Sequence, residues 1–358
     1  IEKYCKIPEG DKVGEPLVIE LFFQVFMYAV FDSKAPIRKA ILSIARKNAK
    51  TAYIACLMLL FVCGPERKLN SRIASGALSR DQAAEVFNFA YKMIMQDATL
   101  SKVTRVIVSF KKIIGLSDNV EYSALSAEGK TNHGKGPLVA VLDEVGQVRG
   151  ATNDFFEAIT TSQGALAQPL LIMISTQAAT DNDYFSIELD AAVNAPRDTV
   201  VCHWYSAEED AALDDKRAWQ AANPSLGRIK QIAAMEDDAK EAAQQPSKEN
   251  SFRWLHLNQR IEASAPFVSR DLWKANGAPP CIPEGSAVWL GYDLSAVSDL
   301  TAEVMVARID GVWHVIPTFW VPGTNLLQKS RDDKVPYTKW RDDGHLIATP
   351  GNTVDYDF

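Results

Sequence analysis

Lys50 and Thr51 lie in a short polar segment whose residue types could bind the phosphates of a nucleotide. The segment ARKNAKT (45–51) follows a short apolar run and precedes a long one. A lysine at the start of a helix can reach the β- and γ-phosphates of ATP, and the next hydroxyl can bind Mg²⁺. The free N–H groups and positive dipole end of that helix also attract phosphate. The segment therefore predicts a phosphate-binding loop.

This loop lacks both glycines of the usual GxxxxGK[ST] pattern, because Ile44 and Ala49 occupy their positions. Glycine is favoured where a loop needs a positive φ or a close backbone approach. An alanine in such a conformation costs about 1 kcal/mol, which a loop can tolerate. The missing glycines leave one alternative open, namely a degenerate ATPase fold that is kept as an assembly scaffold.

Two further polar segments follow apolar runs. Asp143 and Glu144 come after the run 138–142. An acid pair in this place predicts one carboxylate that holds Mg²⁺ and a second that orients and deprotonates the attacking water. After the apolar run 170–174 the chain continues with side chains that could sense the γ-phosphate, namely Ser175, Thr176 and Gln177. Because ligands bind outside the carboxyl ends of parallel strands, we expect all three segments to surround one nucleotide.

The elements that must position these segments alternate between apolar runs and amphipathic stretches, which is typical of a parallel α/β domain. Near-continuous apolar runs predict strands that are covered on both faces, and they occupy 40–44, 105–110, 138–143 and 170–175. Residues 79–96 predict a helix with Ser79 as its N-cap. The longest apolar run, 52–63, predicts a buried helix.

Composition then changes along the chain. From residue 206 the sequence is rich in alanine and acidic residues, and 229–245 predicts an exposed helix after a turn at 222–227. A second pattern predicts strands at 287–295, 300–310 and 312–321 without a closing helix, the last two joined by an Asp-Gly turn at 310–311. We divide the chain into a P-loop ATPase domain (1–205), a helical subdomain or linker (206–262) and a second domain (263–358) that is incomplete at its end.

The bulk composition excludes several classes of protein. The chain has 358 residues and a net charge of −7, which argues against a protein that coats nucleic acid constitutively. No apolar run reaches the roughly 18 residues of a membrane span. Five cysteines without a CxxC pair predict free thiols and a reducing cytoplasm. A chain that begins with isoleucine is expected to be a fragment.

In the order and spacing of nine segments, the sequence resembles the large terminase subunit of tailed bacteriophages, an ATP-driven motor and nuclease that packages viral DNA. Members of that family often have basic, glycine-poor phosphate loops, so the missing glycines count less against the site. The segments are ARKNAKT, SRDQA (79–83), LVAVLDEVGQ (138–147), ISTQ (174–177), AANPSLG (221–227), FRWLHLNQR (252–260), GYDLSAVSDLTA (291–302), PYTKW (336–340) and TPGNTVDYDF (349–358).

The resemblance implies roles for the residues of the nucleotide site. The phosphate loop binds ATP and Mg²⁺ through Arg46, Lys47, Asn48, Ala49, Lys50 and Thr51. Asp143 and Glu144 match the metal-binding and catalytic acids, and 175–177 match the coupling motif. Gln24 resembles the glutamine that recognises adenine, although it could equally be a glutamine of a core helix. Ring motors need an arginine finger, for which the candidates are Arg80 and Arg149.

The second domain resembles the terminase nuclease, which has a ribonuclease-H-like fold. Such nucleases hold two Mg²⁺ or Mn²⁺ ions between acids from separate strands. Asp293 matches the first metal-binding acid, and helper acids are expected at Asp299, Asp355 and Asp357. The resemblance places two further acidic positions beyond Phe358.

The resemblance also implies a complete function. A ring of identical subunits, expected to be a pentamer, would sit on the procapsid and drive double-stranded DNA inward, and the endonuclease would cut concatemeric DNA. The expected partners are the portal protein and the small terminase subunit, with no membrane, in the cytoplasm of the infected bacterial host and not as a permanent part of the virion. A helicase-like DNA translocase without nuclease activity remains an alternative at this stage.

Overall fold

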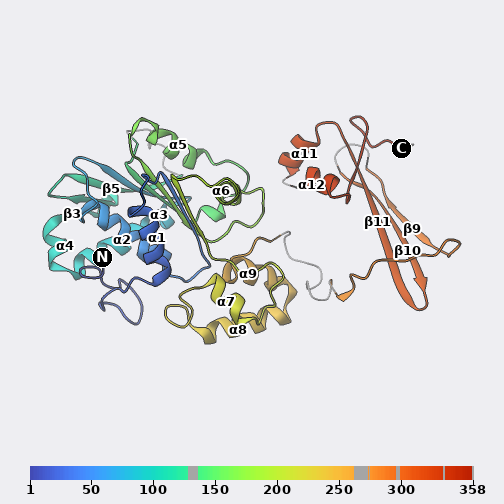
Figure 1. The fold of residues 1–358 in the computed structure, drawn as a ribbon, viewed down its shortest axis with the longest axis horizontal. Coiled ribbons are helices and arrows are strands. Elements are labelled where there is room, and N and C mark those ends of the chain that lie inside the picture. Colours follow the sequence, from blue (N-terminus) through green and yellow to red (C-terminus); the bar gives the residue numbers. More distant parts are fainter. Residues whose placement is uncertain (128–135, 262–272, 274, 296–298, 334, 357–358) are drawn as a thin grey trace. The chain divides into compact units, whose positions relative to one another are not determined.

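The chain was analysed as a computed structural model, which describes residues 1–127, 136–261, 273, 275–295, 299–333 and 335–356 (Figure 1). It divides into two compact units, Ile1–Phe267 and Val268–Phe358. Each unit is described by itself. In the described residues, no helix has the length and apolarity needed to cross a bilayer.

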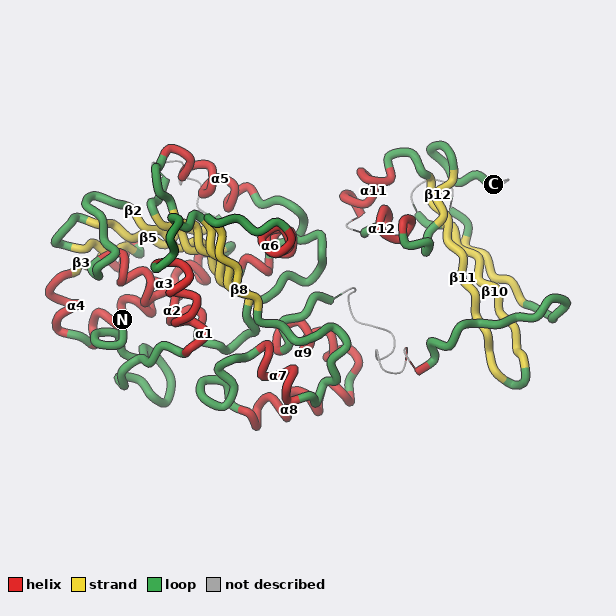
Figure 2. Tube along the Cα trace, viewed as in Figure 1, coloured by secondary structure: helices red, strands yellow, loops and turns green. Residues whose placement is uncertain are grey.

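Unit 1 contains an eight-stranded sheet with the order β3-β4-β5-β2-β6-β7-β1-β8. Helices cover both of its faces (Figure 1, Figure 2). One core lies against α1, α2 and α3, and a second lies against α5 and α6. The strands are β1 (Lys39–Ser43), β2 (Arg72–Ala77), β3 (Thr104–Ile107), β4 (Lys112–Gly115), β5 (Val120–Ser126), β6 (Val139–Asp143), β7 (Leu170–Ser175) and β8 (Val200–Trp204). The helices around them are α1 (Leu21–Phe31), α2 (Lys50–Val62), α3 (Arg80–Gln96), α4 (Ala98–Val103), α5 (Asp154–Ser162) and α6 (Tyr184–Asn194).

The central strands form where the apolar runs predicted them. Every residue of β6 and of β7 is buried, because helices cover both faces of the sheet there. The helix α2 is apolar on nearly all sides, and nine of its 13 residues are buried, which confirms the buried helix expected over 52–63. Ser79 caps α3 as predicted, in a reciprocal capping box with Gln82.

The sheet is parallel, as predicted, except at one edge. The strand β4 runs antiparallel to both β3 and β5, so the sheet is mixed. The strand expected over 105–110 ends at Ile107, and the chain continues into the short 3-10 helix η1 (Val108–Phe110). Lys111 then adopts a φ of 51°, which turns the chain back into β4. Phe110, the last residue of η1, is 71% exposed.

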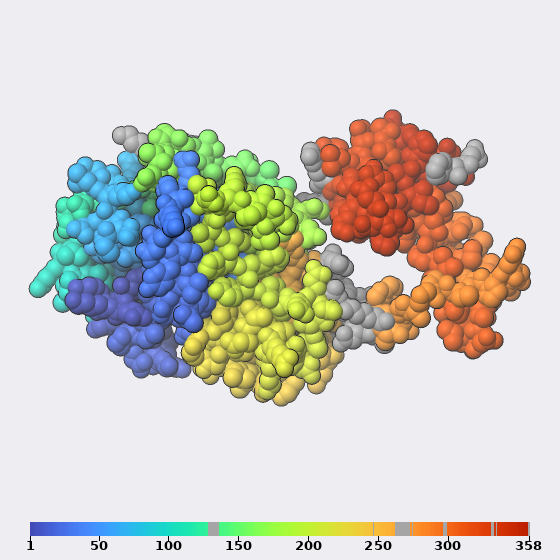
Figure 3. Space-filling model, in the orientation of Figure 1, coloured from blue at the N-terminus to red at the C-terminus, as the bar shows by residue number. Residues whose placement is uncertain are grey.

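A helical subdomain follows β8 and consists of α7 (Lys216–Ala222), α8 (Ile232–Gln244) and α9 (Pro246–His256). It has its own core around Trp219, Met235 and Phe252. Ala45 of the phosphate loop belongs to that core, so the subdomain packs directly on the loop. Figure 3 shows the subdomain, in yellow, against the blue and green parts of unit 1. The helix expected over 229–245 is confirmed as α8, which begins three residues later.

Unit 2 contains a four-stranded sheet with the order β12-β11-β10-β9. Its elements are β9 (Trp289–Asp293), β10 (Thr301–Ile309), β11 (Val312–Pro322), α11 (Leu326–Asp333), α12 (Tyr337–Asp342) and β12 (Ile347–Thr349). Asp310 and Gly311 have φ values of 50° and 85°, which confirms the predicted tight turn. The expectation of three strands without a helix is wrong, because two short, charged helices and a fourth strand follow β11.

Candidate nucleotide-binding and nuclease sites

The three polar segments meet at one edge of the sheet of unit 1. The strand β7 lies between β6 and β1 and runs parallel to both. Asp143 pairs with Ile174, and Ser43 pairs with Ser175, so the three strands end at the same level. The phosphate loop leaves β1 at this edge and leads into α2 at Lys50. This is the place where an open parallel sheet binds its ligands.

The phosphate loop adopts two positive φ values without a glycine. Lys47 has a φ of 65° and Ala49 a φ of 58°. Each such residue costs about 1 kcal/mol relative to glycine. Ile44, at the other position where the usual pattern has glycine, is fully buried and its N–H donates to the Ser175 carbonyl at 3.0 Å. Of the two replaced glycines, Ala49 alone needs the left-handed conformation.

Lys50 folds its ammonium group back onto the loop. Its Nζ donates to the carbonyl oxygens of Ile44 at 3.1 Å and Ala45 at 2.9 Å. Burial lowers the pKa of Lys50 to about 8, while the carboxylates of Asp143 and Glu144 oppose that shift. Phosphate oxygens would offer this cation the negative charge that the two backbone carbonyls lack.

Asp143 is a buried carboxylate at the end of β6, with 6% of its surface exposed. Its Oδ1 accepts a hydrogen bond from the Glu144 N–H at 2.8 Å. Burial and the neighbouring Glu144 raise the pKa of Asp143 to about 7, and the charge of Lys50 opposes this. A divalent cation would offset the charge that burial disfavours, and carboxylate oxygens are the ligands that Mg²⁺ prefers. Thr51, in the first turn of α2, could supply a hydroxyl to the same ion. These residues therefore fit a magnesium site.

Two glutamines that we did not predict hold the second acid. The Oε2 atom of Glu144 accepts hydrogen bonds from Gln82 Nε2 at 2.6 Å and Gln147 Nε2 at 2.5 Å. Gln82 is fixed in turn by its capping box with Ser79 at the start of α3. The S-x-x-Q spacing was visible in the sequence, but it indicated a helix start and not a contact with an acid 62 residues away.

The segment after β7 is locked to the segment after β6. The Ser175 Oγ atom accepts a hydrogen bond from the Gly146 N–H at 2.9 Å. A Cβ atom on Gly146 would lie 2.1 Å from the Thr176 carbonyl oxygen, so a side chain has no room there. Thr176 and Gln177 are both buried. The hydrogen bond and the close backbone approach thus join residues 175–177 to the segment that follows the acid pair.

Asn258, another residue that we did not predict, connects this edge to the helical subdomain. It is fully buried, with a φ of 55°. Its Oδ1 accepts from the Gln177 N–H at 2.7 Å, and its Nδ2 donates to Ser43 Oγ at 2.9 Å and to the Tyr205 carbonyl at 2.8 Å. One side chain thus joins the ends of β7, β1 and β8 where the chain leaves α9. A single asparagine after an apolar helix end carries no sequence signal for such a role.

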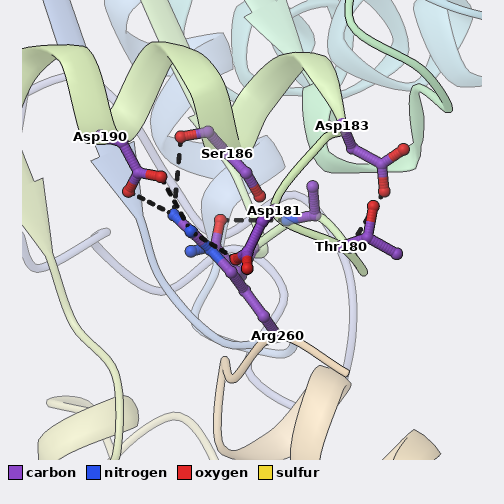
Figure 4. A network of polar contacts seen from close by, with 8 residues as sticks. Thr180, Asp181, Asp183, Ser186, Asp190 and Arg260 are labelled. Carbon is purple, nitrogen blue, oxygen red and sulfur yellow. Dashed lines mark hydrogen bonds and ion pairs between the residues drawn. The ribbon is translucent and has the colours of Figure 1, made fainter. Parts of the chain in front are cut away.

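Arg260 fixes the segment that follows Asn258 (Figure 4). Its guanidinium donates to Asp190 at 2.6 and 2.9 Å and to Asp181 at 2.8 Å, in the loop and helix after β7. Its Nη2 atom, which also donates to Asp190, contacts the Ser186 carbonyl at 3.5 Å, and the guanidinium carbon lies 5.5 Å from the ring centre of Trp204. The exit of the helical subdomain is therefore anchored to α6 as well as to the strand ends.

Asn48 connects the phosphate loop to the same subdomain. Its side chain is 1% exposed, and its Nδ2 donates to Asn223 Oδ1 at 3.1 Å. Its Oδ1 accepts from Ser225 Oγ at 2.5 Å. Because both polar atoms of the side chain are engaged, a contact of Asn48 with a nucleotide would come from its backbone. The N–H of Arg46 donates to the Leu255 carbonyl at 2.9 Å, which adds a backbone link.

Gln24 lies in the first turn of α1, one residue after Phe23, whose ring stacks on that of Tyr53 in α2 with 4.3 Å between the ring centres. Its Nε2 donates to the Ile19 carbonyl at 2.6 Å. It lines a cavity of about 530 Å³ together with Ile1, Tyr28 and Leu60. This arrangement does not test the adenine contact of Gln24, which stays a prediction.

The two arginine-finger candidates lie at opposite sides of the acid pair in the sequence. Arg149 is engaged within the chain: its Nη1 donates to Asp183 at 3.1 Å, and its guanidinium lies 5.3 Å from the ring centre of Trp254. Arg80 is the first residue of α3. Neither role is tested by this arrangement, and both stay predictions.

In unit 2, Asp293 is the last residue of β9, as predicted, and pairs with Ala302. The Asp299 N–H donates to Ser295 Oγ at 3.1 Å, and the Tyr356 hydroxyl donates to the Ser295 carbonyl at 3.1 Å. The segment that carries Asp355 therefore lies beside the end of β9. Asp357 falls outside the described residues. The described parts of the chain contain no group of three or more acidic, histidine or cysteine ligands, so they do not by themselves fit a two-ion site.

Two models of known protein families match consecutive parts of the chain. A family model described as the ATPase domain of the terminase large subunit matches residues 22–193, and one described as its endonuclease domain matches 197–357. The large terminase subunit of Enterobacteria phage HK97 is 48% identical over 359 residues, which cover 100% of this chain and 71% of the relative. The chain belongs to the large terminase subunit family.

Solved structures and a more distant relative are similar to this terminase subunit as well. The crystal structure of the HK97 bacteriophage large terminase matches with a TM-score of 0.71 and covers 100% of this chain and 74% of that one. The large terminase subunit of Lactococcus phage p2 is 21% identical over 143 residues, or 40% of this chain and 26% of the relative.

Family membership has direct consequences for the predictions. This terminase subunit is a DNA-packaging motor protein with an α/β ATPase domain followed by an endonuclease domain. The endonuclease match disfavours a translocase without a nuclease, and the ATPase match disfavours an inert scaffold. The endonuclease model begins at residue 197, so it includes the helical subdomain as well as unit 2.

Proposed function

We propose that this terminase subunit hydrolyses ATP at the edge of the sheet where β1, β7 and β6 end. The hydrolysis would drive the translocation of double-stranded DNA into the procapsid. The observation that carries the proposal is the convergence of one lysine with two carboxylates at this edge. The pKa of Lys50 responds to the charges of both Asp143 and Glu144, although these acids lie more than 90 residues further along the chain.

In this proposal, the phosphate loop binds the triphosphate. Lys50 leaves the carbonyls of Ile44 and Ala45 and pairs with the β- and γ-phosphates. Arg46 and Lys47, both exposed, add positive charge beside them. Thr51 and Asp143 hold Mg²⁺, which when bound neutralises charge on the phosphate oxygens.

Glu144 is the proposed general base, which orients and deprotonates the attacking water. A base needs a fixed position within hydrogen-bond reach of that water. The two amide groups of Gln82 and Gln147 supply this fixation, because both donate to the same carboxylate oxygen. We assign these glutamines as positioning residues for Glu144.

In this proposal, residues 175–177 transmit the structural change that accompanies ATP hydrolysis to the helical subdomain. Ser175 follows the acid pair through its bond to Gly146, and Gln177 passes the shift to Asn258. Asn48 forms a second route, from the phosphate loop to Asn223. Movement of the helical subdomain relative to the sheet is the proposed motion that drives DNA.

For unit 2 we propose a metal-dependent endonuclease that cuts concatemeric DNA. Asp293 is its proposed first acidic ligand for Mg²⁺ or Mn²⁺, since it ends a strand as such ligands do. Asp299 and Asp355 are proposed helpers. A ribonuclease-H-like fold is our proposal for this unit, and the division at 1–205, 206–262 and 263–358 is kept as a proposal too; the last boundary lies outside the described residues.

The proposed partners are double-stranded DNA, the portal protein and the small terminase subunit. The proposed assembly is a homo-oligomeric ring, a pentamer, on the procapsid. We propose that the subunit works in the cytoplasm of the infected bacterial host and leaves the virion after packaging. The proposal includes no membrane partner.

The proposal is tested first by Lys50→Ala, with Lys34→Ala as a control because Lys34 is an exposed lysine that precedes β1, whereas the phosphate loop follows that strand. We expect Lys50→Ala to lose ATP turnover and most Mg²⁺-ATP binding, since the phosphates lose their central cation. Lys34→Ala should keep both. Wild-type ATP turnover in Lys50→Ala would contradict the assignment of the nucleotide site. If the wild-type protein itself showed no specific affinity for ATP, the result would favour a degenerate ATPase fold that serves as an assembly scaffold.

A further inference from the structure

Lys230 is a buried cation in the helical subdomain that has no role in the site described above. It precedes α8 by two residues and is 4% exposed. Its Nζ donates to Asn223 Oδ1 at 2.8 Å. Within the described part of the chain, no carboxylate forms an ion pair with it. A buried ammonium group normally needs an anion, and a neutral carboxamide oxygen does not provide one.

The ammonium group of Lys230 lies next to the phosphate loop. Asn223 Oδ1 accepts from Lys230 Nζ and also from Asn48 Nδ2, at 3.1 Å. Asn48 stands between Lys47 and Ala49 in the loop. Two donors that share one oxygen must lie close together, so Lys230 reaches the loop from the side of the helical subdomain.

The charges around Lys230 are mainly positive. Burial, together with the charges of Lys47 and Lys50, lowers the pKa of Lys230 to about 7, while Asp238 on α8 opposes the shift. His256 on α9 faces the same region, and burial together with the charge of Lys230 lowers its pKa to about 4. His256 is therefore neutral at pH 7. Lys230 thus lies near two further lysines, the half-buried Lys50 and the exposed Lys47, and near one opposing carboxylate, Asp238.

We propose that Lys230 is a second phosphate-binding lysine, supplied by the helical subdomain, which pairs with the triphosphate of bound ATP. Its ammonium group would exchange the neutral Asn223 oxygen for an anionic phosphate oxygen, and charge-assisted hydrogen bonds of this kind are the stronger ones. The contact would tie the helical subdomain to the nucleotide directly. This inference rests on the proposed ATP site and adds a ligand from a different part of the chain.

The test compares Lys230→Met, Lys230→Arg and the control Lys240→Met in the complete chain. Lys240 lies on the same subdomain and is 71% exposed. Each variant is titrated with a fluorescent, non-hydrolysable ATP analogue and with ADP, both with Mg²⁺. We expect Lys230→Met to weaken binding of the ATP analogue by about tenfold or more, which is the effect of one charge-assisted hydrogen bond, and that of ADP by less. Lys240→Met should bind like wild type, and Lys230→Arg should retain most of the affinity.

The pH dependence of ATP-analogue binding distinguishes a contact between Lys230 and phosphate from a purely structural role of Lys230. The charged form of Lys230 binds phosphate, so binding raises its pKa above the value of about 7 in the free protein. Its contribution to binding is therefore complete below the pKa of about 7 in the free protein and is lost as the pH rises through the higher pKa of the bound state. Lys50 adds a similar decline in every variant, so the comparison is between variants. Arginine stays charged over this pH range, so the affinity of Lys230→Arg for the ATP analogue should depend less on pH than that of wild type. This variant should also fold like wild type.

Two outcomes would overturn the inference. One is wild-type affinity of Lys230→Met for the ATP analogue, and the other is a wild-type pH profile of Lys230→Arg. The second remains measurable if the methionine variant fails to fold. Lys50→Ala distinguishes this inference from the proposed function: if Lys50→Ala loses binding and Lys230→Met does not, only the role of Lys230 fails. If both bind like wild type, the nucleotide site itself is misassigned.

Discussion

Replacing Asn258 by alanine should strongly destabilise unit 1. The change removes the acceptor of the Gln177 N–H and the donor to Ser43 Oγ and the Tyr205 carbonyl, all at a fully buried position. Each buried partner that is left without a hydrogen bond costs about 1 kcal/mol or more. Alanine at a φ of 55° costs about 1 kcal/mol as well. We therefore expect the free energy of unfolding to fall by about 4 kcal/mol.

Asn119→Ala is the matched control for this change. Asn119 also has a positive φ, 51°, but it is exposed and its side chain donates a single hydrogen bond, to Asn70 Oδ1 at 3.0 Å. It should lose only about 1 kcal/mol, most of it from the backbone conformation. Urea unfolding followed by tryptophan fluorescence measures both, because Trp219 and Trp254 lie in unit 1. Equal losses in Asn258→Ala and Asn119→Ala would refute the reasoning, since they would show that the three buried hydrogen bonds contribute nothing.

Three further changes probe the strand ends and unit 2. Gly146→Ala places a Cβ atom 2.1 Å from a backbone oxygen and should lower the melting temperature clearly, at a cost of about 2 kcal/mol or more, whereas Gly164→Ala has open space and should be near neutral. Gln82→Ala removes one of two donors to Glu144 and should lower kcat for ATP about tenfold while KM stays near wild type. Asp293→Ala, in the full-length protein, should abolish DNA cleavage and leave ATP turnover intact.

Each of these changes has an outcome that contradicts its premise. A wild-type melting temperature for Gly146→Ala would mean that the two segments do not approach as closely as described. An unchanged kcat in Gln82→Ala would remove Gln82 as a positioning residue. Cleavage that persists in Asp293→Ala would exclude this acid from the nuclease site.

The sequence predicted the parts of the fold whose environment leaves a local pattern. The strands β6 and β7 are buried on both faces, so each consists of an unbroken apolar run with polar residues at its end. Helix α2 is covered on nearly all sides and reads as apolar throughout. The run at 105–110 is also mainly apolar, yet its strand lies at the edge of the sheet and ends at Ile107, which composition alone does not distinguish.

The residues that link the nucleotide site to the helical subdomain were not predictable in this way. Asn48 contacts Asn223 across 175 residues, and Asn258 contacts Ser43 across 215. A buried asparagine has the same local sequence context as one in a turn, and only the folded chain brings its partners together. The short helices α11 and α12 were missed for a different reason: each is charged and too brief to show a clear apolar face.

The central claim is that ATP bound at Lys50 drives DNA movement. The most direct measurement is the amount of DNA that becomes protected from nuclease digestion inside procapsids when the complete motor is supplied with ATP. We predict that wild type and Lys34→Ala protect similar amounts and that Lys50→Ala protects none. Protection by Lys50→Ala at the wild-type level would contradict the account.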